Sequence, residues 1–145
     1  MTAARLPDLV QAYKALGHPT RIRILAMLRP GELCACQITA VLALAPSTVS
    51  AHLAELRRAG LIAERKEGRW VHYRLAEGEH ADEIGERLWP RIMRDPQVRR
   101  DTSTVKRLRA VPVEELCRVD LDLNRLTRPR GAERSGGVEA SRRRR

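Results

Sequence analysis

Apolar residues recur at the spacing of an amphipathic helix twice near the start of the chain. The first helix has one apolar face, made of Leu6, Leu9, Val10, Tyr13 and Leu16, and Gly17 ends it. The second helix begins at His18-Pro19, because a proline in the first turn of a helix loses no hydrogen bond. Pro30-Gly31 ends it. The pattern therefore predicts two short helices that face a common core.

Two further helices follow, joined by a short turn at Leu44-Ala45. The third runs from Cys34 or Ala35 to Leu42, and the fourth covers residues 46–59, with Pro46 in its first turn and Gly60 as its cap. Two short helices joined by a tight turn are the arrangement of a helix-turn-helix.

Strand-like runs at residues 61–66 and 69–75 flank Glu67-Gly68 and predict a β-hairpin. A fifth helix follows at about residues 80–89, and Pro90 kinks or ends it. A helix-turn-helix followed by a basic hairpin is typical of a winged helix-turn-helix. The predicted fold class is thus mainly α with a β-hairpin wing.

Three regions are expected along the chain. Residues 1–94 form the winged helix-turn-helix domain for DNA binding and dimerisation. Residues 95–126 form a C-terminal extension that is partly helical, with candidate helices from Asp101 to Ala110 and from Pro112 through Cys117. Residues 127–145 are rich in Gly, Ser, Pro and Arg, and we expect them to be disordered.

The composition fits a small basic protein. Aromatic residues make up 3% of the 145 residues and there is no Phe, so aliphatic residues must build the core. Small helical proteins often gain stability by dimerising. No apolar run is long enough to span a bilayer, and a signal-peptide core is missing. We therefore expect a cytoplasmic protein with no membrane partner, whose three cysteines stay reduced.

The net charge of +10 is divided between the ordered region and the tail. Residues 127–145 hold seven Arg and two Glu, which is half of the surplus. Such a tail either solubilises the chain or binds nucleic acid without sequence preference.

The fourth helix and the hairpin carry the candidate DNA contacts. Small polar side chains at a helix start bind base edges or phosphates, and free N–H groups there attract phosphate. Basic residues at a hairpin tip suit phosphate or the minor groove. Each residue alone also fits a surface or capping role, but helix order, turn and wing together favour DNA binding. The candidates are Ser47, Thr48, Ser50, Ala51, His52, Arg57, Arg65, Lys66 and Arg69.

Two cysteines one residue apart, Cys34 and Cys36, lie at the start of the third helix. Thiolates select soft ions, and trivalent arsenic or antimony prefers three sulfurs in a pyramid. In a regular helix these positions point to nearly opposite sides, so joint ligation needs a frayed start or a bent helix. Cys117 is the other cysteine. It either supplies the third sulfur, from the same chain or across a dimer, or is a small apolar residue beside Leu116. In the second case water, hydroxide or an added thiol completes a two-thiolate site.

Segments 16–25, 47–53 and 67–75 resemble the ArsR/SmtB family of metal-sensing repressors, and the resemblance covers roughly residues 9–89. It implies a homodimer made by the first and last helices of the core, a two-fold operator in double-stranded DNA, and release of DNA when inducer binds. The stretch from Glu32 to Cys36 resembles the box of arsenite-responsive members. Thr39 stands where the best-known form of that box has a third cysteine. The capping residue is His18 where the family usually has Asp.

A homodimer needs apolar positions that one small domain does not fully bury. On the first and fifth helices these candidates are Leu9, Tyr13, Ile84 and Leu88.

The sequence thus predicts a dimeric repressor that senses As(III) or Sb(III), with no organic cofactor and no enzymatic activity. One alternative keeps DNA binding but senses cadmium, lead or thiol oxidation. A thiol-based arsenate reductase is another, although Cys34 lacks a Gly-rich anion cradle and no Arg closely follows Cys36. The last is a structural DNA-binding protein that uses its Arg-rich tail.

Overall fold

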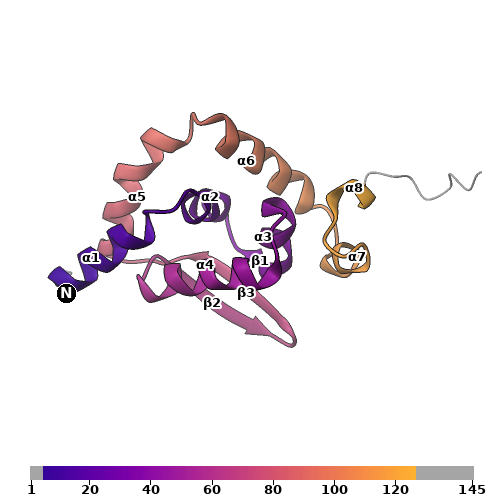
Figure 1. Ribbon diagram of the computed structural model, residues 1–145, viewed down its shortest axis with the longest axis horizontal. Coiled ribbons are helices and arrows are strands. Elements are labelled where there is room, and N and C mark those ends of the chain that lie inside the picture. Colours follow the sequence, from indigo (N-terminus) through magenta and orange to yellow (C-terminus); the bar gives the residue numbers. More distant parts are fainter. Residues whose placement is uncertain (1–4, 127–145) are drawn as a thin grey trace, which may run out of the picture.

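The computed structural model describes residues 5–126, and the predicted disordered tail lies outside them. The described chain forms helices and a three-stranded antiparallel sheet in the order β1-β3-β2 (Figure 1). The elements are α1 (Leu6–Ala15), α2 (Pro19–Leu28), β1 (Leu33–Cys34), α3 (Ala35–Leu42), α4 (Pro46–Arg58), β2 (Ile62–Glu67), β3 (Trp70–Leu75), α5 (Glu79–Ile92), α6 (Pro96–Leu108), α7 (Val113–Arg118) and α8 (Leu123–Leu126). The predicted helical fold with a hairpin wing is confirmed, and β1 is an addition to it.

Local sequence explains the boundaries of several helices and of the hairpin. His18 precedes α2 in an extended conformation, and its Nδ1 accepts a hydrogen bond of 3.1 Å from the backbone N–H of Thr20. Ala43 ends α3 in the left-handed conformation, with φ 53°, which starts the tight turn into α4. Gly68, with φ 58°, allows the chain to reverse between β2 and β3. Histidine therefore performs the capping role that Asp has in the family pattern.

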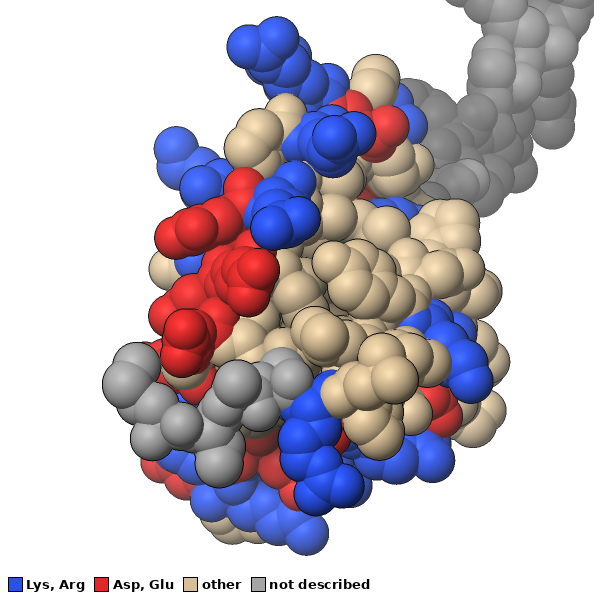
Figure 2. All heavy atoms as spheres, turned by 90° about the vertical axis from the view of Figure 1, so that its left-hand side faces the viewer, with Lys and Arg blue, Asp and Glu red and all other residues tan. Residues whose placement is uncertain are grey.

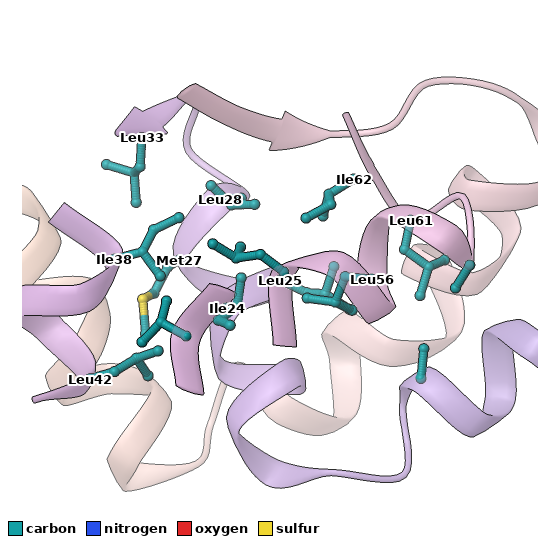
Figure 3. Close-up of a cluster of buried hydrophobic side chains, with 14 of the residues drawn as sticks. Ile24, Leu25, Met27, Leu28, Leu33, Ile38, Leu42, Leu56, Leu61 and Ile62 are labelled. Carbon is teal, nitrogen blue, oxygen red and sulfur yellow. The ribbon is translucent and has the colours of Figure 1, made fainter. Parts of the chain in front are cut away.

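The main core is built around α2 (Figure 3). Ile24, Leu25, Met27 and Leu28 are at most 3% exposed. Around them pack side chains from β1, α3, α4 and the start of the wing, namely Leu33, Ile38, Leu42, Leu56, Leu61 and Ile62. Because interiors are close-packed, a shift at the start of α3 would displace the side chains of α2, α4 and the wing that pack against it.

The C-terminal helices pack onto this domain. In Figure 1, α5 and α6 arch over α2, and α7 and α8 lie beyond α3. The Arg23 guanidinium donates two hydrogen bonds, of 2.7 and 2.9 Å, to the carboxylate of Asp101 in α6. Asp101 is 3% exposed. A second apolar cluster, centred on Ala40, Leu108 and Leu116, joins α3 to α6 and α7. The extension therefore reaches the start of the helix-turn-helix.

Two details of α5 differ from the sequence predictions. Pro90 lies inside the helix, which continues to Ile92, so the alternative that this proline ends the helix is wrong. Ile84 is 7% exposed and belongs to the main core, and Leu88 packs against that core. The expectation that a single protomer leaves Ile84 uncovered is therefore wrong. The Ile84 side chain is buried within the protomer itself.

No single helix within residues 5–126 is long and apolar enough to cross a membrane. The helices α3 and α4 meet the length and hydropathy criteria only as a pair, across a bend of 115°. Both helices bury their apolar faces in the core.

Candidate functional site

The two neighbouring cysteines occupy different backbone conformations. Cys34 closes β1 and precedes α3 with extended backbone, and its N–H donates to Oε1 of Gln37 at 2.8 Å. Cys36 lies in the first turn of α3 and is partly exposed, whereas Cys34 is 2% exposed. Because Cys34 stands before the helix, the geometry of a regular helix does not force the two side chains apart. The structure thus has the non-helical start that joint ligation requires.

The third cysteine comes to the pair from the C-terminal extension of the same chain. The Sγ atoms of Cys36 and Cys117 are 3.7 Å apart, although the residues are 81 positions apart in sequence. Two thiolates on one tetrahedral metal, with bonds of about 2.3 Å, lie roughly 3.8 Å apart. The observed separation therefore suits two sulfurs that share one soft atom. All three cysteines are free thiols.

The surroundings of Cys36 keep its side chain in the protonated thiol form. Burial raises the pKa of Cys36 to about 12, and the neighbouring sulfurs of Cys34 and Cys117 contribute to the rise. Among residues 5–126, no group of three or more His, Cys, Asp or Glu side chains is already arranged to hold a metal ion. A three-sulfur site therefore requires a rearrangement of the thiols beyond the Cys36–Cys117 contact seen here.

The segment before Cys34 connects the thiols to two other parts of the molecule. The carboxylate of Glu32 pairs with the guanidinium of Arg65 in the wing, and this contact lowers the pKa of Glu32. The carbonyl of Glu32 accepts a hydrogen bond of 3.1 Å from Arg109, which also donates to the carbonyl of Gly31 at 3.0 Å. Glu32 thus lies between the C-terminal helices and the wing and contacts both. The spacing of residues in the sequence did not predict this junction.

The candidate DNA-binding residues lie on α4 and the wing. Ser47, Thr48, Ser50 and Ala51 are exposed at the start of α4, opposite the buried face of Val49, Leu53 and Leu56. The wing protrudes beside this helix (Figure 1). Lys66 and Arg69 are exposed near its tip. The face therefore presents polar groups on the helix and cations on the hairpin.

Several of the candidates, among them Arg57, Arg65 and His52, already have partners within the protein. Arg57 pairs with Glu64 at 2.6 Å, and Arg65 pairs with Glu67 at 2.9 Å as well as with Glu32. His52 lies against His18, with ring centroids 4.4 Å apart. Burial lowers the pKa of His52, helped by His18 and Arg21, which favours the neutral form of its ring. Any ligand on this face would have to compete with these internal partners for the three side chains.

One side of α1 leaves apolar side chains uncovered. Leu6, Val10 and Tyr13 are 74, 43 and 58% exposed, and Leu9 is partly buried. Figure 2 shows this side of the molecule, where a broad uncharged area lies between charged side chains. Leu6 and Val10 were part of the helical pattern but were missing from the predicted interface. Their position on the same face as Tyr13 is the signal that identifies them.

Comparisons with known proteins agree with this arrangement. The profile described as "Bacterial regulatory protein, arsR family" matches residues 18–64, from the cap of α2 into β2. The arsenic resistance transcriptional regulator ArsR1 of Pseudomonas putida is 47% identical over 64 residues, which are 43% of this chain and 50% of that protein. The arsenical resistance operon repressor of Escherichia coli is 44% identical over 68 residues, 46% of this chain and 58% of that protein.

A cadmium resistance regulator is also similar. The CadC homolog of Staphylococcus aureus is 36% identical over 83 residues, 57% of this chain and 68% of that protein. The matched part of this chain spans only about half the length of the two arsenic-related relatives.

Solved structures share the fold. HlyU from Vibrio cholerae has a TM-score of 0.55 at 34% identity, covering 61% of this chain and 95% of that one. A homodimeric winged helix-turn-helix DNA-binding domain from Mycobacterium bovis, of a possible ArsR-family regulator, has a TM-score of 0.54 at 28% identity. It covers 62% of this chain and 88% of that one.

Proposed function

The chain belongs to the arsR family of bacterial regulatory proteins, and on that premise we propose that it is a dimeric repressor released from operator DNA by As(III) or Sb(III). Cys34, Cys36 and Cys117 of one protomer are the proposed ligands. The DNA contacts are those of α4 and the wing, and the second protomer docks on the exposed face of α1. Such a regulator acts in the cytoplasm, where its operator is.

The observation that carries the proposal is the contact of 3.7 Å between the sulfurs of Cys36 and Cys117. Thr39, at the position of the family's third cysteine, is 8% exposed, and its hydroxyl donates to the carbonyl of Ala35 at 2.8 Å. It offers no sulfur. Cys117 of the C-terminal extension is the remaining sulfur next to Cys36, so the chain has three thiols near the start of α3.

The chemistry of arsenite suits a cluster of neutral thiols. Arsenite in neutral water is As(OH)₃, and three thiols exchange with its hydroxyl groups to form three As–S bonds and three water molecules. No electron is transferred and the product is uncharged, so a partly buried site is not penalised. A divalent cation such as Cd²⁺ must displace protons and leaves a net charge on the three-thiolate site. This difference favours arsenite over cadmium.

An operator-binding titration tests the proposal. The reduced, full-length protein is bound to DNA that it has selected from a random pool, and arsenite or cadmium is added. Arsenite should weaken binding about 5- to 150-fold, the usual range for coupling between two sites. Release by cadmium alone would favour the alternative ion, and no release by arsenite at saturation would refute the proposal.

Glu32 is proposed as the connection between the thiols and the wing. Its carboxylate holds Arg65, and its backbone is two residues from Cys34 and bonded to Arg109. When the sulfurs draw together, the segment before Cys34 moves, and the position of Arg65 changes with it. Binding of the inducer thereby changes the position of Arg65, a cation on the proposed DNA-binding face.

A matched pair of substitutions tests this route. Glu32→Gln and Glu67→Gln each remove one carboxylate from Arg65, so both should strengthen DNA binding by about two- to fivefold, the size of an exposed ion pair. Both should also steepen the salt dependence by about one phosphate contact. Only Glu32→Gln should weaken release by arsenite, because Glu32 is two residues from Cys34 in the chain, whereas Glu67 ends β2 at the tip of the wing. Equal loss of release in both variants, measured by fluorescence anisotropy, would contradict the route.

A further inference from the structure

Cys36 and Cys117 are the two thiols that both touch each other and reach the surface. Their sulfurs are 3.7 Å apart and both residues are partly exposed, whereas Cys34 is 2% exposed. We propose that Cys36 and Cys117 are an oxidation site that forms an intrachain disulfide, and that this disulfide locks the repressor on DNA by blocking the inducer site. The bond follows from the geometry alone, and only its consequence rests on the proposed function.

The step needs a two-electron oxidant, here a hydroperoxide. One thiol sulfur attacks the peroxide, becomes a sulfenic acid, and releases the reduced oxygen as an alcohol or water. The second thiol then attacks that sulfur, and the sulfenic oxygen leaves as water with the remaining proton. Two thiols thus lose two electrons and two protons in all, and one S–S bond replaces two S–H bonds.

The two sulfurs can approach each other without a change in the position of α4 and the wing. An S–S bond of about 2.05 Å requires them to move closer by roughly 1.7 Å. Helix α3 is fixed by Ile38 and Leu42 in the main core, whereas α7 is six residues long and has a single buried side chain, Leu116, in the smaller second cluster. The movement therefore falls on α7. The turn into α4, at the other end of α3, stays in place.

This oxidation would have the opposite effect to that of an oxidant that releases the repressor from DNA. The disulfide removes two of the three sulfurs that arsenite needs, yet the helix-turn-helix keeps the conformation it has here. The oxidised protein should bind its operator and ignore arsenite until a reductant restores the thiols.

The bond itself is tested by peptide mapping. Full-length protein is treated with hydrogen peroxide, alkylated and digested without reductant. The expected product links the peptides of Cys36 and Cys117 within one chain. Its mass is that of the two reduced peptides less two hydrogens, and Cys34 in it is alkylated. Cys34→Ser should still form it, and Cys117→Ser should not. A link between Cys34 and Cys36, a link between chains, or no link after treatment would overturn the proposal.

The lock is tested on the same oxidised sample. It should bind operator as the reduced protein does, show no release with arsenite, and regain release after a phosphine reductant. Loss of operator binding upon formation of the Cys36–Cys117 bond would overturn the lock. If the reduced protein also fails to respond to arsenite, the proposed function fails, while the mapped disulfide stands or falls separately.

Discussion

Replacing Cys36 with serine should leave operator binding nearly unchanged and abolish its release by arsenite. The side chain faces Cys117, not the exposed start of α4, so no DNA contact is lost. Without it, only Cys34 and Cys117 remain, and two thiols hold a trivalent soft ion poorly. The roughly 5- to 150-fold weakening by inducer should fall to none. Anisotropy titrations of labelled operator, with and without arsenite, measure both quantities.

The partner substitutions locate the third sulfur. Cys117→Ser should reduce release sharply, because the local box then holds only Cys34 and Cys36. Adding Thr39→Cys to Cys117→Ser should restore release, since that residue is one helical turn after Cys36 and on the same side of α3. Failure of Cys117→Ser to change the response would assign the residue a packing role. Full response in a Cys34→Ser/Cys36→Ser double variant would rule out sensing by these thiols.

Charged substitutions on α1 should convert the dimer to monomers and remove specific DNA binding. Val10→Asp and Tyr13→Glu place a charge on side chains that are 43 and 58% exposed in the protomer. They therefore test the interface without disturbing the core. A two-fold operator needs two recognition helices, so affinity should fall toward the non-specific level, on the order of 10³-fold or more weaker.

Sedimentation velocity gives the oligomeric state directly. Arg107→Glu, an exposed charge reversal on α6, serves as the control that should remain dimeric. Leu88→Glu is a poorer test, because Leu88 packs on the protomer's own core and its loss would destabilise the fold. Dimers that persist in both α1 variants would place the interface elsewhere.

The parts of this fold that depend on neighbouring residues could be predicted from the sequence. Apolar spacing located α1 to α4, because an amphipathic helix carries its own period. Gly68 located the hairpin turn, since a reversal there needs a residue that tolerates positive φ. The paired Cys34 and Cys36 pointed to soft-ion chemistry for the same local reason.

Contacts between distant residues could not be predicted in this way. The strand β1 has two residues, too few to show a period, and exists only because Leu33 and Cys34 pair with β3. The bond from Arg23 to Asp101 spans 78 residues, and the contact of Cys36 with Cys117 spans 81. Each depends on the path of α5 and α6 over α2. The sequence therefore left open whether Cys117 belongs to the site and from which chain it comes.

Arsenic-edge X-ray absorption on the arsenite-loaded, reduced protein tests the central claim most directly, because it counts the atoms bound to arsenic. The wild-type protein should show three sulfur neighbours and no oxygen. Cys117→Ser should show two sulfurs, with oxygen in the remaining position. A wild-type spectrum with the same sulfur count as Cys117→Ser, or one dominated by oxygen, would contradict a three-thiol site built from α3 and α7.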